Sequence, residues 1–331
     1  MFGSIQDGGL LPVQLGKSNM ITTSNTRVNR IIGKLALGAA LSAALASALY
    51  AKSFGDFSTP VSAEIGSDPS LNTPSNDGCP ILSPDGLSLY MATNRPEFEG
   101  DTGPADLNIW VARRASTTDG WGAPEMLPAP INTAANEFCP DPLRGKGLFF
   151  VRAPFNTQNG DIFRTRLDNA GWREPERLPD TVNSTTQEWS PSYFEDEAGN
   201  EVLYFSRAAG PAGGPHTIYA SVNFGPAQAV SELSSGGDAA RPNVRKDGRE
   251  IVFDSARAPN LGGQDVWVAT RGSTAEPWGV PEPLQVVSSP LNDTRASLSW
   301  DGTFLLVGSL RAGGEGSADI YVSSRPRLTG R

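Results

Sequence analysis

Three stretches of this chain repeat one pattern, and that pattern decides the fold. They read SPDGLSLYMATNR (residues 83–95), RKDGREIVFDSAR (residues 245–257) and SWDGTFLLVGSLR (residues 299–311). Each stretch has Asp-Gly at its third and fourth positions and ends on Arg. Asp-Gly between two apolar runs is a strong β-hairpin signal, because both residues tolerate the positive φ that a tight turn needs. The repeat predicts that one hairpin recurs along the chain.

Outward from these hairpins, the repeat becomes a unit of about 50 residues with four short strands. Two degenerate turns, RGKG (residues 144–147) and EAGN (residues 197–200), fit the same place and bring the units to five. The third strand of each unit opens with a polar residue, followed by Ile or Val and an aromatic residue. These openings are Asn108, Asp161, Thr217, Asp265 and Asp319. An aromatic residue with a nearby Pro then marks the fourth strand, as in Trp121 and Pro124.

One four-stranded sheet of this length cannot bury both of its faces, whereas sheets stacked around an axis cover one another. The sequence therefore predicts an all-β, five-bladed β-propeller of four-stranded antiparallel blades, with a β-sandwich as the alternative. The fifth unit lacks a fourth strand. Residues 56–80 match residues 120–140, with Phe57 and Pro60 in the places of Trp121 and Pro124. We expect this N-terminal segment to complete the last blade and close the ring.

The N-terminus has the features of a secretory signal peptide. Arg27, Arg30 and Lys34 precede an apolar run over residues 35–49, which is shorter than the roughly 20 residues of a membrane-spanning helix. Ala46-Ser47-Ala48 follows as a small-x-small cleavage site. We predict a signal peptide over residues 1–48, cleaved near Ala48 or Ala51, and one propeller domain over residues 52–331. A membrane anchor that is not cleaved is the alternative, and a periplasmic or extracellular location follows from cleavage.

The chain is acidic, with a formal net charge of −9. Removing residues 1–48 takes away four basic residues and one acidic residue, which leaves −12. Such a charge excludes the electrostatic binding of nucleic acid or of an anionic membrane surface. We expect a monomer that is not an integral membrane protein.

Propeller topology brings the start of the first strand, the end of the second and the start of the third together in each blade. The start of the first strand carries an acid, and we name this set the acid ring: Asp77, Glu137, Glu188, Asp238 and Asp293. The end of the second strand carries the terminal arginines: Arg95, Arg152, Arg207, Arg257 and Arg311. A planar guanidinium has five donors, so each Arg is expected to bond its acid and the polar residue that opens the third strand.

Two interpretations of the acid ring remain open. The pairs can be ties within each blade, or the five carboxylates can surround the central channel and bind a ligand, a partner or a cation such as calcium. Glycoside hydrolysis needs an acid/base pair of carboxylates about 5–10 Å apart, which such a ring could also supply. Neighbouring arginines oppose a catalytic role, because a nearby positive charge lowers the pKa of a carboxyl group. A general acid needs that pKa to be raised.

Cys79 and Cys139 occupy equivalent positions in the first two blades, each followed by Pro. Two cysteines in an exported chain predict a disulfide, with buried free thiols as the alternative. His216 is the sole histidine, and no G-x-S-x-G motif accompanies it, so it is interpreted as a solvated loop residue. No cluster of His or Cys suggests a transition-metal site.

The loop of residues 96–107 carries four acids, Glu97, Glu99, Asp101 and Asp106. Their spacing does not follow the EF-hand pattern, so a solvated loop is favoured over a calcium site. The loop is predicted to lie on the same face as the acid ring. We expect a ligand or partner on this loop-rich face.

The order of N-[ST]-x-x-x-[DE], S-P-D-G, S-x-R, D-I-[WYF] and W-x-x-P resembles the PD40 (WD40-like) repeats of TolB-type propellers, over residues 54–324. The chain departs from that family in lacking an N-terminal α/β domain and a sixth blade. The resemblance implies a propeller in an extracytoplasmic setting.

The predicted function is that of a non-catalytic scaffold in the bacterial cell envelope, which binds a protein or a glycan and needs no cofactor. The alternative is a carbohydrate-active enzyme, similar to glycoside hydrolases, that uses carboxylates at the channel mouth.

Overall fold

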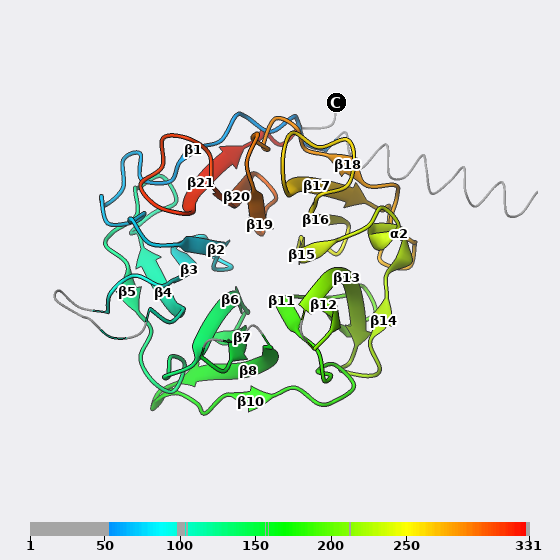
Figure 1. Ribbon diagram of the computed structural model, residues 1–331, viewed down its shortest axis with the longest axis horizontal. Coiled ribbons are helices and arrows are strands. Elements are labelled where there is room, and N and C mark those ends of the chain that lie inside the picture. The colour runs from blue at the N-terminus through cyan, green and yellow to red at the C-terminus, as the bar shows by residue number, and fades with distance from the viewer. Residues whose placement is uncertain are drawn as a thin grey trace, which may run out of the picture. The chain divides into compact units, whose positions relative to one another are not determined.

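Five antiparallel sheets form the blades of a propeller, whose innermost strands surround a central channel (Figure 1). The computed structural model describes residues 53–97, 103, 105–155, 157, 159–211 and 213–328. The predicted signal peptide and its cleavage site lie outside these residues and stay predictions. The prediction of an all-β, five-bladed propeller is confirmed.

The strands follow the repeat from the inside of each blade outward. The first blade contains β2 (Asp77–Leu82), β3 (Ser88–Thr93), β4 (Asn108–Arg113) and β5 (Glu125–Met126). The second contains β6 (Asn136–Pro142), β7 (Gly147–Ala153), β8 (Asp161–Asp168) and β10 (Glu176–Arg177), and the third contains β11 (Glu188–Glu195), β12 (Glu201–Gly210), β13 (Gly213–Val222) and β14 (Gln228–Ala229). The fourth contains β15 (Ala240–Val244), β16 (Glu250–Ser255), β17 (Asp265–Thr270) and β18 (Glu282–Pro283). The fifth contains β19 (Asp293–Leu298), β20 (Phe304–Ser309), β21 (Asp319–Ser324) and β1 (Val61–Ser62).

Two short elements depart from the predicted unit of four strands. In the second blade β9 (Gly171–Trp172) pairs with β8 and adds a small hairpin. A single helical turn, α2 (Ser231–Ser234), leads into the fourth blade. Within the described part of the chain, no helix is long and apolar enough to cross a membrane.

The Asp-Gly turns form as the sequence predicts. Gly86, Gly248 and Gly302 have φ of +69°, +70° and +74°, in the left-handed region where glycine carries no steric cost. The carboxylate of Asp85 accepts hydrogen bonds from the Ser83 hydroxyl and the Leu87 backbone N–H, at 2.6 and 3.0 Å. Asp therefore organises the turn, and Gly allows it to close.

Apolar side chains fill the spaces between neighbouring blades. One cluster joins Ile109 and Val111 of the first blade to Leu148 and Phe150 of the second. Another joins Val252 of the fourth blade to Val307 and other residues of the fifth. Because most of the second strand of each blade is covered on both faces, it reads as a nearly continuous apolar run.

The N-terminal segment closes the ring, which confirms the prediction. Val61 and Ser62 of β1 pair antiparallel with Val322 and Tyr321 of β21, and Figure 1 shows the blue strand beside the red one. Phe57 packs among the core residues of the fifth blade with 6% of its surface exposed. The closure is non-covalent, so its strength depends on this packing.

We expect Phe57→Ala to lower the free energy of unfolding by about 3–5 kcal/mol, because it leaves a cavity where the chain ends meet. Val61→Ala, at a side chain that is 49% exposed in the same segment, should cost less than about 1 kcal/mol. Urea unfolding of both variants checks the difference. Equal unfolding midpoints would show that the packing of Phe57 does not stabilise the closed ring.

Candidate functional site at the mouth of the central channel

The terminal arginines hold the wall of the channel together. Each guanidinium stacks on the aromatic residue of the third strand in its blade, with Cζ 4.4–5.3 Å from the ring centroid. These pairs are Arg95–Trp110, Arg152–Phe163, Arg207–Tyr219, Arg257–Trp267 and Arg311–Tyr321. Each guanidinium also donates to a backbone carbonyl in the connection that leads into its blade. The carbonyls are those of Leu71, Ile131, Val182, Leu233 and Val287, whose side chains are all fully buried.

The next residue of each connection reaches back to the preceding blade. Asn183 shows the arrangement: its Oδ1 accepts from the Ile162 N–H at 2.8 Å, and its Nδ2 donates to the carbonyls of Ile162 and Leu178 at 3.0 Å. Asn72, Asn132, Ser234 and Ser288 accept from the equivalent N–H in the other blades. The connections are thus bound to two blades at once.

Four members of the acid ring pair with the terminal arginine of their blade. The pairs Asp77–Arg95, Glu137–Arg152, Glu188–Arg207 and Asp293–Arg311 all have an N···O distance of 2.7 Å, and the four acid side chains are fully buried. Each acid also accepts from a backbone N–H four residues earlier. These acids lie in the wall and do not line the channel, so a ligand could reach them only if the blade opened. Their predicted role as a ligand ring stays a prediction.

The fourth blade departs from the predicted pairing. Arg257 donates to Ser255 and to the Leu233 carbonyl, and no hydrogen bond between described residues joins it to Asp238. The place of the acid is taken by Ala239, whose N–H bonds the His216 carbonyl just as the N–H of Glu188 bonds the Gly160 carbonyl in the third blade. Asp238 stands one residue earlier, and a shift of one residue turns a strand side chain to the other face.

Within the described residues, no hydrogen bond joins a terminal arginine to the polar residue that begins the third strand of its blade. Asp265 and Asp319 accept from the backbone N–H of Leu261 and Glu315 and thereby close their own loops. Asp161 pairs with Arg177 on the outermost strand. Apart from the four acid pairs, the donors and faces of the terminal arginines are satisfied by backbone carbonyls and aromatic rings, which carry no signal in the spacing of acids.

Removing one partner of a buried pair leaves the other charge uncompensated. We therefore expect Glu188→Gln to lower the free energy of unfolding by about 3 kcal/mol. Glu125→Gln breaks the exposed Arg113–Glu125 pair, which has a similar N···O distance of 2.6 Å. This substitution should change the free energy of unfolding by less than about 1 kcal/mol. Chemical denaturation distinguishes the two, and a wild-type midpoint for Glu188→Gln would refute the structural role.

The innermost strands share a feature that the sequence analysis missed. Each carries a β-bulge, at which the register with the second strand shifts by one residue. At its centre is a non-glycine residue with φ between 48° and 57°. We name these five the bulge residues: Cys79, Cys139, Ser190, Arg241 and Arg295. The available signal was the Pro that follows four of them, because Pro disfavours helical conformation at the preceding residue.

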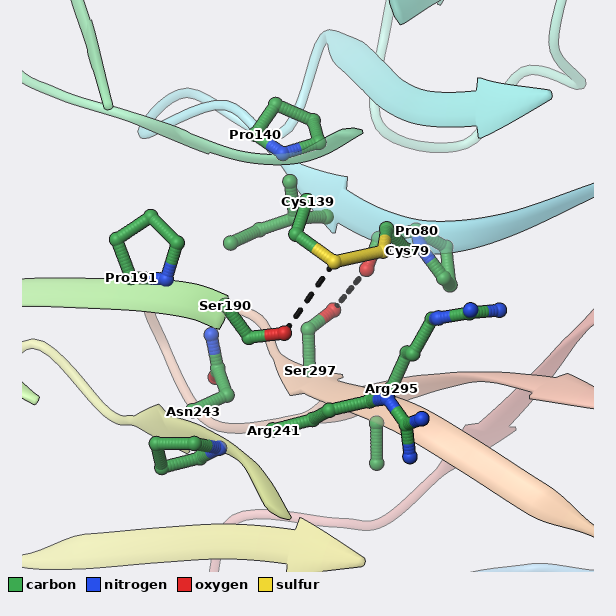
Figure 2. Close-up of a pocket in the computed structure, with 13 residues that line it drawn as sticks. Cys79, Pro80, Cys139, Pro140, Ser190, Pro191, Arg241, Asn243, Arg295 and Ser297 are labelled. Atoms are coloured by element: carbon green, nitrogen blue, oxygen red, sulfur yellow. Dashed lines mark hydrogen bonds between the residues drawn. A yellow bond between two sulfur atoms is a disulfide. The ribbon is translucent and has the colours of Figure 1, made fainter. Parts of the chain in front are cut away.

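The bulge residues face one another across the channel (Figure 2). Cys79 and Cys139 form a disulfide with their Cα atoms 4.9 Å apart, and the Ser190 hydroxyl lies 3.2 Å from the Cys139 sulfur. Arg241 and Arg295 occupy the other side of the ring. The space between these residues is only about 30 Å³, enough for a water or two, so the channel is closed to larger ligands at this level.

Above this constriction the channel widens into a cavity of about 470 Å³, which we name the mouth pocket. Its walls come from the starts of four innermost strands and from two loops between second and third strands. They are Ala105, Leu107, Asn136, Phe138, Cys139, Phe155, Thr157, Trp189, Arg241 and Arg295. Aromatic walls with a few polar groups are typical of small-ligand sites.

Arg241 and Arg295 are held by one carboxylate at the base of the mouth pocket. Arg241 Nη1 donates to Asp254 Oδ2 at 2.7 Å, and the Arg295 backbone N–H donates to Asp254 Oδ1 at 2.9 Å. Burial raises the pKa of Asp254 to about 6, although both arginines oppose that shift. Burial and the neighbouring Arg241 charge lower the pKa of Arg295 to about 10.

His216 lies behind the mouth pocket, so its interpretation as a solvated residue is corrected. Its ring stacks on Trp189 with centroids 4.8 Å apart, and its Nδ1 is 3.6 Å from an Asp238 oxygen. Nε2 is buried and has no hydrogen-bond partner among the described residues. A hydrogen-bonded chain continues from Asp238 through Gln264 to Arg241.

Asp254 gives stability a pH dependence of definite sign. The folded state keeps this proton up to about pH 6, whereas the unfolded chain releases it near the ordinary value of 3.8. Between these values the folded state binds more protons, so the contribution of Asp254 to stability falls as pH rises.

We compare the free energy of unfolding of the wild type with that of Asp254→Asn. The wild-type value minus the variant value should fall by up to about 3 kcal/mol between about pH 4 and pH 7. Urea unfolding of both proteins across this pH range measures the change. Subtracting one stability from the other removes the contribution of the carboxylates that both proteins share. A difference that rises with pH would mean that the ionised carboxylate is the stabilised form.

The acidic loop of residues 96–107 borders the mouth pocket through Ala105 and Leu107. Glu99 and Asp101 lie outside the described residues, so the prediction of a solvated loop, with a calcium site as the alternative, stays a prediction. Among the residues that the structure does describe, no group of three or more His, Cys, Asp or Glu side chains could hold a metal ion. Asp106 stands between the two lining residues and is partly exposed.

No family model and no curated protein matches the chain. Solved structures match its fold. A thermostable family-43 glycoside hydrolase has a TM-score of 0.52 at 11% identity, over 80% of this chain and 93% of that one. A GH43 endo-arabinanase from Bacillus licheniformis has a TM-score of 0.50 at 14% identity, over 78% of this chain and 95% of that one. A further glycoside hydrolase has a TM-score of 0.53 at 10% identity, over 87% of this chain and 96% of that one. At these identities the likeness shows the fold alone.

Two predictions are overturned by these comparisons. The resemblance to PD40 repeats of TolB-type propellers is wrong, since the matching structures named above are glycoside hydrolases and no family model supports it. Its motifs are explained by the needs of any four-stranded blade: a tight turn, an arginine tie and an aromatic residue under it. The prediction of a non-catalytic envelope scaffold is also contradicted, since the matching structures named above are of enzymes.

Proposed function

We propose that this protein is carbohydrate-active and that one sugar unit of an oligosaccharide enters the mouth pocket. The observation that carries the proposal is the pocket itself, which combines Phe138, Phe155 and Trp189 with the polar side chains of Asn136 and Thr157. Aromatic faces pack against the apolar face of a sugar ring, while amides and hydroxyls bond its hydroxyl groups. The glycoside hydrolases among the structures of like fold make a saccharide the first ligand class to test.

Proton transfer in this pocket needs a carboxylate outside the acid ring. Four ring acids are fully buried and paired with arginines, so they are not placed to act as general acid or base. The loop of residues 96–107 offers an alternative, because Asp106 stands in the chain between Ala105 and Leu107, which line the pocket. We assign one of the two carboxylate roles to Asp106; the second carboxylate is not among the described residues that line the pocket. The predicted signal peptide supports a site of action outside the cytoplasm, where glycans of the cell surface are found.

A panel of neutral and acidic oligosaccharides should identify a ligand that raises the melting temperature of the full chain. Phe155→Ala should abolish that shift, because the Phe155 ring lines the pocket with 36% of its surface exposed. Val280→Ala, at a side chain that is 87% exposed, is the matched control and should keep it.

Release of reducing ends from the same panel tests turnover. Asp106→Asn should keep binding and lose turnover, whereas Asp119→Asn, at an exposed residue that does not line the pocket, should keep both. The proposal fails if no saccharide stabilises the protein, or if Phe155→Ala binds as the wild type does.

A further inference from the structure

We propose that the saccharide of the mouth pocket carries a negatively charged group, either a uronate carboxylate or a sulfate ester, and that Arg241 and Arg295 bind this group. The inference rests on the proposed function and narrows its substrate class to acidic glycans. It is argued from the charge of the pocket, the unused donors of the two arginines and the way the fold holds them.

The charge of the pocket is positive. Arg241 and Arg295 are the only charged side chains among the described residues that line it. Asp254, buried beneath them, neutralises one of the two positive charges. Asp238 stands further away and reaches Arg241 only through the Gln264 amide. The described lining of the pocket is therefore positive, although the net charge of the chain is −9, and it would attract an anion.

The donors of the two arginines exceed the acceptors that the protein offers them. A guanidinium has five N–H donors. Within the described part of the chain, Arg241 donates from its guanidinium through Nη1 alone, to Asp254 and Gln264 at 2.7 and 2.9 Å. Among the described residues no acceptor bonds the guanidinium of Arg295. Asp254 accepts from Arg241 Nη1 and from the Arg295 backbone N–H, and no hydrogen bond between described residues joins it to the Arg295 guanidinium. The remaining donors are therefore available to a planar oxyanion that accepts two parallel bonds.

The fold holds both arginines in an unusual backbone conformation. Their φ values are 52° and 57°, a region that costs a non-glycine residue of order 1–3 kcal/mol. Gly78 leaves room for one of them, because a Cβ there would lie 2.9 Å from Arg295 Nη1. The other bulge residues are uncharged, so the positive charge is confined to one side of the channel. Burial beside Arg241 lowers the pKa of Arg295, and an anion bound between them would relieve this repulsion.

Calorimetric titration of the full chain tests the inference with oligogalacturonides, neutral galacto-oligosaccharides of the same length and their sulfated forms. We expect an acidic oligosaccharide to bind at least tenfold more tightly than its neutral counterpart. Arg295→Gln should remove this preference, and it leaves the Asp254–Arg241 pair intact. Arg113→Gln, which removes an exposed arginine of the first blade, is the matched control and should keep the preference.

A second variant is expected to strengthen binding, an effect that misfolding could not produce. Asp254→Asn removes the negative charge under the arginines and should tighten the binding of the acidic oligosaccharide. Binding of sulfated but not uronate oligomers would support the inference and identify sulfate as the group. Neutral oligomers that bind as tightly as acidic ones would overturn it and leave the proposed function standing. If no oligosaccharide binds at all, both proposals fail.

Discussion

The propeller depends on the buried guanidinium at the end of each second strand. It stacks on an aromatic ring of the third strand and bonds a carbonyl of the connection from the preceding blade. In four blades it also pairs with a buried acid of the first strand. One residue therefore fixes three strands and the junction between two blades. Because a guanidinium has several donors in one plane and a flat face, no other side chain could replace it.

With the wall held in this way, the innermost strands can vary at one position. The five bulge residues have the same backbone conformation, yet they carry cysteine, serine and arginine side chains. On one side of the channel they form a disulfide, and on the other they present two guanidinium groups (Figure 2). The repeated scaffold and the chemistry of the channel are thus carried by different residues, only a few positions apart along each strand.

This separation bears on the comparison with glycoside hydrolases of the same fold. A shared fold does not transfer a function, which depends on the site that the fold carries. The acids that define the repeat are here structural members of the wall, and the groups that face the mouth pocket are aromatic rings, amides and guanidinium groups. None of the described residues that line the pocket is a carboxylate.

The sequence by itself determined the architecture: the number of blades, the turns, the terminal arginines and the closing segment. These follow from local rules of turn formation, strand period and burial, which act on residues close together in the chain. It also placed Cys79 beside Cys139. Only the tertiary structure decided which side chains face the channel. The β-bulge breaks the two-residue alternation and turns Arg241 and Arg295 into the pocket while the acids stay in the wall. The bulge depends on pairing with the second strand and on neighbouring blades, so the pattern of one strand could not reveal it.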